Sequence, residues 1–389
     1  IDRILRVYSH NLREPFGGKQ LLLVGDVFQL EPVVKNDERE ILNRAYPTPY
    51  FFSARVFSQI DLVSIELQKV YRQTDSVFVS VLDHIRTNTA GAADLQLLNT
   101  RYGSHIEESE ADMYITLATR RDTVDSINEK KLAELAGEPI TFEGSIEGDF
   151  PESSLPTSQE LVLKPGAQII FIKNDFDRRW VNGTIGVIAG IDEEEETIYV
   201  ITDDGKECDV KRESWRNIRY RYNEKTKEIE EEVLGSFTQY PIRLAWAITV
   251  HKSQGLTFSR VVIDFTGGVF AGGQAYVALS RCTSLDGIQL KKPINRADIF
   301  VRPEIVNFAG RFNDRQAIDK ALKQAQADVQ YAAAARAFDK GDMEECLEQF
   351  FRAIHSRYDI EKPVPRRLIR LKLGIINTLQ EQNKKLKEQ

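Results

Sequence analysis

Residues Thr249–Gly255 read T-V-H-K-S-Q-G, and residues Ala278–Arg281 read A-L-S-R. Each segment ends an apolar strand-like run or borders an apolar helical stretch. In an α/β sheet, ligands bind beyond the carboxyl ends of the parallel strands, where such segments begin. The two segments therefore predict an α/β fold with its ligand-binding groups at one edge of the sheet.

The first segment is dense in side chains that bind anions. Lys252 supplies a point charge for phosphate, and Ser253 and Gln254 supply hydrogen bonds. Gly255 lets the backbone approach a ligand closely. His251 fits this pattern, although a hydrogen-bonded core histidine is its alternative interpretation. Consecutive residues of these types exceed what a buried strand exit requires, and they favour a functional site.

Two arginines are candidates for contacting phosphate. Arg72 lies in Tyr71-Arg72-Gln73, ahead of an amphipathic stretch, and Arg281 ends the second segment. A guanidinium presents a planar fork of donors to phosphate oxygens. Arg281 is the candidate arginine finger, which stabilises charge on a γ-phosphoryl group during its transfer. Each arginine alone is also compatible with an ordinary surface position.

A third motif, Gly25-Asp26-x-x-Gln29-Leu30-x-Pro32, follows the apolar run 20–24. The Gln29 amide both donates and accepts hydrogen bonds, so it can contact a γ-phosphate or the attacking water. The alternative is a turn with an exposed glutamine. No G-x-x-x-x-G-K-[ST] occurs in the sequence, so the phosphate-cradling loop of a nucleotide-driven motor is absent from this segment.

The pattern of elements changes twice along the chain. Apolar strands and amphipathic helices alternate up to about residue 156 and again from 242, as in a parallel α/β domain. Between them, short strands separated by glycine and charged turns predict a small inserted β barrel. From about residue 311 the sequence is alanine-rich and helical, with a predicted hairpin turning at Gly341. Residues 20–24 and 60–67 are also predicted to be strands.

Composition excludes several classes of protein. The 389 residues carry a net charge of −7, which still permits a basic channel for nucleic acid. The three cysteines form no C-x-x-C pair, the histidines show no metal-ligand spacing, and no apolar run has the length of a membrane span. We therefore predict no metal site, no membrane contact and a reducing cytoplasmic location.

Taken together, the motifs resemble those of the superfamily 1B DNA helicases, the RecD-like and petite-integration-frequency (PIF-type) group. The matching stretches include K-Q-L-L-L-V-G-D-V-F-Q-L-E-P-V, L-Q-K-V-Y-R-Q, I-T-V-H-K-S-Q-G-L-T-F and A-Y-V-A-L-S-R. This resemblance implies two RecA-like domains with ATP and Mg²⁺ between them, and 5′-to-3′ translocation on single-stranded DNA. It also places such a protein in DNA repair or recombination.

The resemblance assigns roles to particular residues. It implies that Gln29 senses the γ-phosphate and that Arg72 and Arg281 contact it. Gly25, Asp26, Gln254 and Gly255 fall in its nucleotide-binding and coupling motifs. The residues that it places against the DNA strand are Thr119, Arg120, His251, Lys252 and Ser253.

The resemblance also implies a domain plan. Residues 1–67 correspond to the end of a truncated first RecA-like domain, and 68–156 with 241–310 to the second. Residues 157–240 correspond to an inserted Src-homology-3-like barrel. The helical extension 311–389 lies outside the family core, near the pattern of one tetratricopeptide-type hairpin, and is a candidate surface for a protein partner.

The family's phosphate loop and acidic magnesium-binding pair precede everything in this sequence. We therefore expect a C-terminal portion of a helicase that does not hydrolyse ATP alone and needs the missing N-terminal half of the motor, from the same or another chain. Two alternatives stay open. One is a RecD-type subunit of a recombination nuclease complex, and the other is a non-catalytic module that binds single-stranded DNA or protein.

Overall fold

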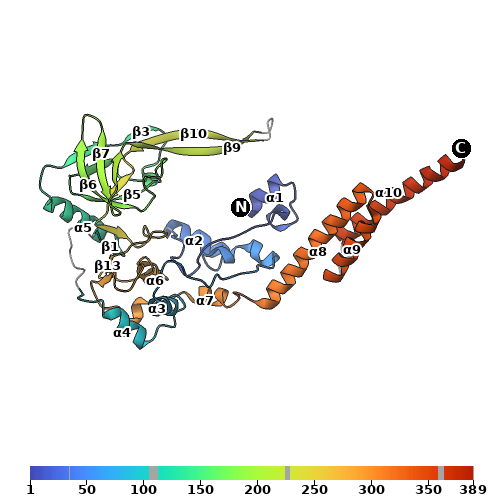
Figure 1. Cartoon of the computed structure of the whole chain (residues 1–389), viewed down its shortest axis with the longest axis horizontal. Helices are drawn as coiled ribbons and strands as arrows, with labels where there is room; N and C mark the ends of the chain where they lie inside the picture. The colour runs from blue at the N-terminus through green and yellow to red at the C-terminus, as the bar shows by residue number, and fades with distance from the viewer. Residues whose placement is uncertain (35, 105–112, 224–227, 358–362, 389) are drawn as a thin grey trace. The chain divides into compact units, whose positions relative to one another are not determined.

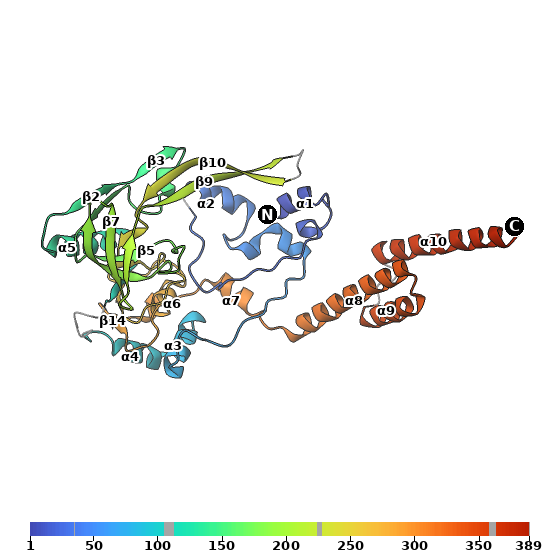
Figure 2. The same cartoon turned by 45° about the horizontal axis from the view of Figure 1, so that its top comes forward.

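The computed structural model describes residues 1–34, 36–104, 113–223, 228–357 and 363–388. The chain divides into two compact units (Figures 1 and 2). The first comprises residues 1–54 and 68–306, and the second comprises 55–67 and 307–389.

A four-stranded parallel sheet lies at the centre of the first unit. Its strand order is β12 (Ala247–Thr249), β1 (Ile115–Ala118), β13 (Val261–Asp264) and β14 (Ile288–Leu290). Every residue of β1 and β13 is buried, which explains their nearly continuous apolar sequence. β1 precedes the β insertion in the sequence, and its two neighbours in the sheet, β12 and β13, follow it. The segments on either side of the insertion therefore form one sheet.

Helices complete the core around this sheet. The core includes Phe78, Val81 and Ile85 of α3 (Ser76–Arg86). It also includes Val277 and Leu279 of α6 (Gln274–Leu279). The other helices of this part of the chain are α4 (Ala92–Asn99) and α5 (Arg121–Glu134). α3 is the amphipathic stretch that follows Tyr71-Arg72-Gln73 in the sequence.

The predicted β insertion consists of antiparallel strands with a core of its own. One sheet has the order β11-β5-β6-β7-β8, a second has β3-β10-β9, and β2 pairs with β4. In the core, the rings of Trp180 and Phe171 stack with their centroids 4.4 Å apart. The strands are β2 (Ile140–Glu143), β3 (Ser145–Gly148), β4 (Glu160–Leu163), β5 (Gln168–Phe171), β6 (Ile185–Asp192), β7 (Thr197–Thr202), β8 (Glu207–Val210), β9 (Glu213–Asn223), β10 (Glu228–Gln239) and β11 (Ile242–Leu244).

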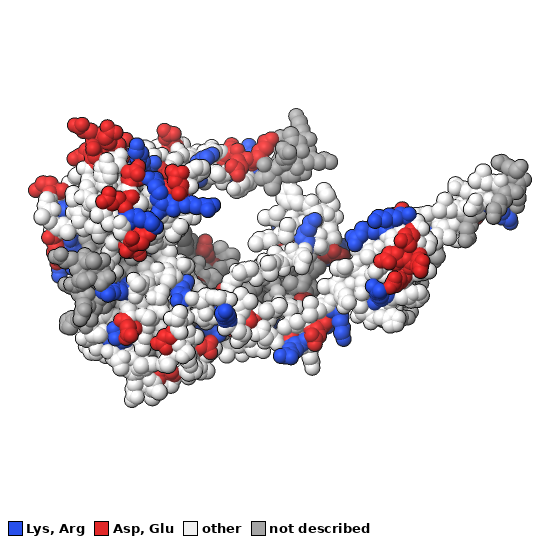
Figure 3. All heavy atoms as spheres, viewed as in Figure 1, with Lys and Arg blue, Asp and Glu red and all other residues white. Residues whose placement is uncertain are grey.

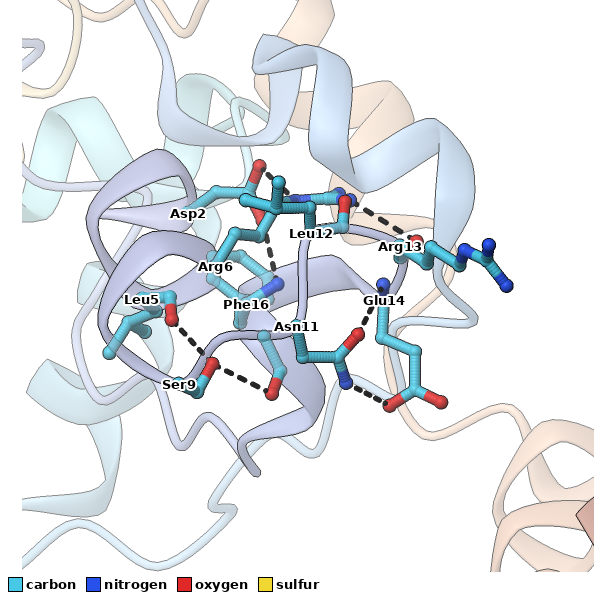
Figure 4. Close-up of polar contacts among 10 residues, drawn as sticks. Asp2, Leu5, Arg6, Ser9, Asn11, Leu12, Arg13, Glu14 and Phe16 are labelled. Atoms are coloured by element: carbon cyan, nitrogen blue, oxygen red, sulfur yellow. Dashed lines mark hydrogen bonds and ion pairs between the residues drawn. The ribbon is translucent and has the colours of Figure 1, made fainter.

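The N-terminal 54 residues are mostly irregular. Their helices are α1 (Asp2–Tyr8) and α2 (Asn36–Ala45), with 3-10 turns at Pro15–Gly18 and Phe51–Ser53. Asp2 fixes the first turn, because its carboxylate accepts from Arg6 Nε at 2.9 Å and from the Phe16 amide at 2.6 Å (Figure 4).

The strands predicted at 20–24 and 60–67 are not present. Both segments are irregular, and neither pairs with another strand among the described residues. Leu22 is 85% exposed and Val24 is 90% exposed. A strand needs neighbours to satisfy its backbone groups and cover its side chains. These apolar segments lack such neighbours, which is why local sequence alone misassigned them.

The second unit is helical. It contains a 3-10 turn (Arg55–Gln59), α8 (Arg315–Lys340), α9 (Met343–Ser356) and α10 (Pro363–Glu388), and α7 (Pro303–Ala309) leads into it. Gly341 ends α8 in the left-handed conformation at φ +83°, as expected for the turn of a helical hairpin.

Candidate nucleotide and DNA site

The parallel sheet brings two of the predicted segments to one edge. Thr119 and Arg120 follow β1, and residues 250–255 follow β12, which is its direct neighbour. The Val250 amide donates to the Ala118 carbonyl at 2.9 Å, so the two loops leave the sheet together. This edge is where parallel α/β sheets place their ligands.

The loop after β12 exposes some of its polar side chains and buries another. Gln254 and Gly255 are exposed, and His251 is half-buried. Ser253 is fully buried, and its hydroxyl donates to the Val250 carbonyl at 2.7 Å. The Ser253 hydroxyl thus closes the turn and lies away from the exposed face of the loop.

Two side chains of this loop have shifted pKa values. Desolvation lowers the pKa of His251, so its imidazole is neutral at pH 7. Lys252 is exposed at the surface, but desolvation of its ammonium lowers its pKa to about 8. The positive charges of Arg243 and Arg121 lower it further. Lys252 thus lies in a positive environment, as expected beside an anionic ligand.

Of the two residues after β1, Arg120 is exposed and Thr119 is buried. Arg120 is exposed, and its Nε donates to the Gly267 carbonyl at 3.0 Å. Thr119 is buried, and its hydroxyl finds no hydrogen-bond partner among the residues that the structure describes. A Cβ added at Gly267 would lie 3.0 Å from that hydroxyl. Thr119 therefore does not face solvent, contrary to its predicted place on the DNA surface.

Arg281 follows α6 and is the largest fully buried side chain of the described residues, at 2% exposure. Its Nε donates to the Val277 carbonyl at 3.0 Å, and its Nη1 donates to the Leu256 carbonyl at 3.2 Å. Its Nη2 donates to the Ser280 hydroxyl at 2.9 Å. Arg281 thus ties the loop after β12 to α6, which a freely projecting arginine finger would not do.

The charge of Arg281 is incompletely compensated. Desolvation lowers its pKa to about 10, and the positive charge of Arg72 lowers it as well, while Tyr276 and Asp26 act in the opposite direction. The guanidinium is still protonated at pH 7, and it donates no hydrogen bond to a carboxylate that the structure describes. A buried, unpaired positive charge is costly unless an anion joins it.

Arg72 lies beside the same segment. Its Nη1 donates to the Ser280 carbonyl at 3.0 Å. The neighbouring Gln73 is buried, and its amide donates to the carbonyls of Ser280 at 3.1 Å and Cys282 at 2.8 Å. Sequence reasoning gave no role to Gln73, yet these bonds hold the Tyr71-Arg72-Gln73 motif against the second arginine.

The Gly25–Gln29 motif also meets α6. The Gln29 amide donates to the Asp26 carboxylate at 3.2 Å, and the Tyr276 hydroxyl donates to the same carboxylate at 3.4 Å. Gly273, at φ +77°, precedes α6, and a Cβ there would come within 2.3 Å of the Phe28 carbonyl. The signal for this contact was Gly272-Gly273 directly before the helix, which sequence reasoning passed over.

Gly25 itself has no structural requirement for glycine. It is exposed, and an added Cβ would meet no atom within 4 Å. Gly255, by contrast, adopts φ +83°, a conformation that favours glycine. Both glycines were predicted to serve the ligand site, but only the backbone conformation of Gly255 favours glycine over other residues.

Comparison with known proteins shows which family the sequence and fold resemble. A family model described as PIF1-like helicase matches residues 1–91. The structure of Bacteroides Pif1 bound to ssDNA shares 37% identity with this chain at a TM-score of 0.63, over 82% of this chain and 72% of that one. This chain belongs to the PIF1-like helicase family. Its fold is accordingly α/β with a RecA-like parallel sheet, joined by antiparallel sheets and a helical C-terminus.

Two further relatives support the assignment to the PIF1-like family. Bacteroides sp Pif1 in complex with ADP-AlF4 has a TM-score of 0.69 and 38% identity, over 80% of this chain and 70% of that chain. The human ATP-dependent DNA helicase PIF1 is 35% identical over 283 residues, which are 71% of this chain. The chain spans only 41% of the length of that human protein.

Metal and membrane features are not evident in the described part of the chain. Those residues contain no group of three or more His, Cys, Asp or Glu side chains that could hold a metal ion. None of the helices described is long and apolar enough to cross a membrane.

Proposed function

We propose that this chain is the C-terminal portion of an ATP-dependent DNA helicase that moves 5′ to 3′ on single-stranded DNA. The observation that carries the proposal is the meeting of Arg72 and Arg281 at Ser280, where Arg72 donates to the backbone carbonyl and Arg281 to the side-chain hydroxyl, close to the loop of Gln29. Two guanidinium groups beside a glutamine suit a triphosphate better than a neutral substrate.

The nucleotide roles follow from this geometry. Arg281 and Arg72 contact the γ-phosphoryl group and stabilise the charge that develops there, while Gln29 senses whether that group is present. Arg281 donates to the carbonyl of Leu256, the residue after Gly255. A movement of Arg281 when the γ-phosphate is lost would therefore shift the loop that carries Gln254 and Gly255. ATP with Mg²⁺ is the expected nucleotide, and the main binding motifs for both lie outside these residues.

The DNA roles are narrower than the sequence suggested. We assign DNA contact to Arg120, His251 and Lys252, which lie at one edge of the sheet and are exposed or half-buried. Ser253 and Thr119 are left out because they are buried. The structure of Bacteroides Pif1 bound to ssDNA supports single-stranded DNA as the ligand.

The proposed domain plan is a truncated first RecA-like domain at 1–67, a second at 68–156 and 241–310, and the barrel at 157–240. The exposed apolar segments at 21–24 and 62–67 support the first of these. Each segment has the sequence of a buried strand, and upstream residues of the motor would provide the neighbouring strands that would cover it. We place the protein in the cytoplasm, in keeping with its free cysteines.

The test is to follow single-stranded DNA binding and ATP hydrolysis in parallel for the 389-residue chain. We expect binding that weakens with salt, and hydrolysis no faster than the buffer blank. The same chain preceded by the missing half of the motor is expected to hydrolyse ATP when DNA is added. Robust hydrolysis by the 389 residues alone would refute the proposal, as would DNA binding that nucleotide never affects in the longer protein.

A further inference from the structure

The helical hairpin of the second unit has a thin core. α8 and α9 pack against each other, and the buried residues described on the two helices are all alanines: Ala327, Ala334, Ala337 and Ala353. One aromatic pair, Tyr331 and Phe350, adds an edge contact with ring centroids 5.8 Å apart. Alanine buries little apolar area, so this interface covers few of the larger side chains on either helix.

The outer face of α9 carries an apolar stripe. Met343, Leu347 and Phe351 are spaced by four residues, and they are 42%, 55% and 57% exposed. Residues four apart lie above one another on a helix, so the three form one line. Acidic side chains flank it at Glu344 and Glu348, and Figure 3 shows acidic groups gathered on this helical unit.

α10 carries a second stripe with the same spacing. Leu371, Ile375 and Leu379 are 57%, 43% and 57% exposed. In sequence, α10 holds seven basic and two acidic residues, so its polar surface is positive. The exposed basic side chains described on it are Arg367, Arg370, Lys384 and Lys385.

Lys372 holds α10 to the helical hairpin of its own chain. Lys372 pairs with Asp339, and its ammonium lies 4.7 Å from the ring centroid of Phe338, at the end of α8. Figures 1 and 2 both show α10 running on past the hairpin of α8 and α9. Lys372 directly follows Leu371, so the contact with α8 lies at the start of the stripe, and the three stripe residues are nevertheless exposed.

We propose that α10 of one copy of this chain packs along α9 of a second copy, and that the second copy returns the same contact. The two stripes match in spacing and are opposite in charge. A duplex nucleic acid would use the basic residues and leave the apolar stripe in water, whereas a second copy covers both. A twofold arrangement uses each stripe once per chain and closes without further growth.

The same pairing solves the problem of the thin core. A single helical repeat does not bury a sufficient apolar face by itself and depends on a stacked neighbour. Here the neighbour is the partner's α10, which supplies leucine and isoleucine where the hairpin has mostly alanine. This inference goes beyond the proposed helicase activity and does not depend on it.

The first test measures the mass of the 389-residue chain by sedimentation equilibrium. The unaltered chain is expected to be a dimer at micromolar concentration. Phe351→Glu and Ile375→Glu are each expected to raise the dissociation constant of the dimer by at least about tenfold, because each places a carboxylate in the stripe. Leu322→Glu is the control. It alters an exposed leucine of α8 outside both stripes and should leave the dimer intact.

A charge exchange tests which helices meet. Glu344→Lys with Glu348→Lys should weaken the dimer, and Arg367→Glu with Arg370→Glu should weaken it equally. All four changes together should restore it, and circular dichroism checks that each variant keeps its helices. A monomeric unaltered chain, a dimer indifferent to the stripe variants, or failure of the fourfold variant to restore association would each overturn the proposal.

Discussion

The guanidinium of Arg281 donates a hydrogen bond from Nη1 to the carbonyl oxygen of Leu256, at 3.2 Å. Leu256 directly follows Gly255, the last residue of the T-V-H-K-S-Q-G stretch. Arg281, which we assign to the γ-phosphate, therefore also holds in place the loop that we propose couples nucleotide to DNA. Catalytic and structural effects at Arg281 must for this reason be measured separately.

Arg281→Ala should destabilise the first unit. It removes four hydrogen bonds from a buried position and takes away the side-chain donor of the Leu256 carbonyl, and an unsatisfied buried group costs about 1–3 kcal/mol. Arg72→Ala is the matched control, since Arg72 is half-buried and makes one such bond. Thermal unfolding of the 389-residue chain should show a clearly larger fall in Tm for Arg281→Ala. Equal falls in Tm for the two variants would contradict the proposal that Arg281 holds the loop after β12 to α6.

Gly255→Ala should strain the coupling loop. An L-residue at φ +83° costs about 1–2 kcal/mol relative to glycine. Gly25→Ala provides the comparison, because an added Cβ at Gly25 meets no atom within 4 Å. Urea unfolding should show a lower midpoint for Gly255→Ala and little change for Gly25→Ala. A neutral Gly255→Ala would show that the loop relaxes to another conformation freely.

Lys252 should make DNA binding sensitive to alkaline pH. Its pKa is lowered to about 8, so the ammonium is protonated below that value and loses its charge as pH rises through it. Single-stranded DNA affinity should therefore fall between roughly pH 7 and 9, beyond the change that salt alone explains. Lys252→Arg should remove this step, because a guanidinium stays charged throughout. Persistence of the step in that variant would assign it to another group.

Tyr276→Phe should uncouple the Gln29 loop from α6. The change removes the hydroxyl that donates to Asp26 and keeps the ring, so we expect at most about 1 kcal/mol of lost stability. In the protein with its N-terminal half present, DNA-stimulated ATP turnover should fall several-fold while DNA affinity is retained. Tyr220→Phe, on an exposed tyrosine of β9, should change neither quantity.

Much of the fold was predictable because its signals are local. The continuous apolar run at 115–118 is a buried strand, and Gly341 ends a helix. The proximity of Arg120 to the loop 250–255 was also predictable, since parallel neighbouring strands end at the same edge. Motif spacing alone thus located the region of the candidate site.

The remaining features depend on contacts between distant residues. Tyr276 and Asp26 are 250 residues apart, and the sequence around either residue does not predict the hydrogen bond between them. Whether Ser253 points outward or inward is decided by the turn that its hydroxyl closes. The segment 20–24 has the composition of a strand, but it pairs with no strand in the part of the chain that the structure describes, and composition does not reveal which neighbours a segment has.

The most direct test of the proposed motor site uses Arg281→Lys in the protein with its N-terminal half present. Lysine keeps the positive charge and removes the planar fork, so folding is checked by thermal unfolding first. ATP turnover on saturating single-stranded DNA should fall by about 10³-fold or more, as for other arginine fingers, while DNA affinity stays within about threefold. Turnover close to that of the unaltered protein, or a parallel loss of turnover and DNA affinity, would contradict the account.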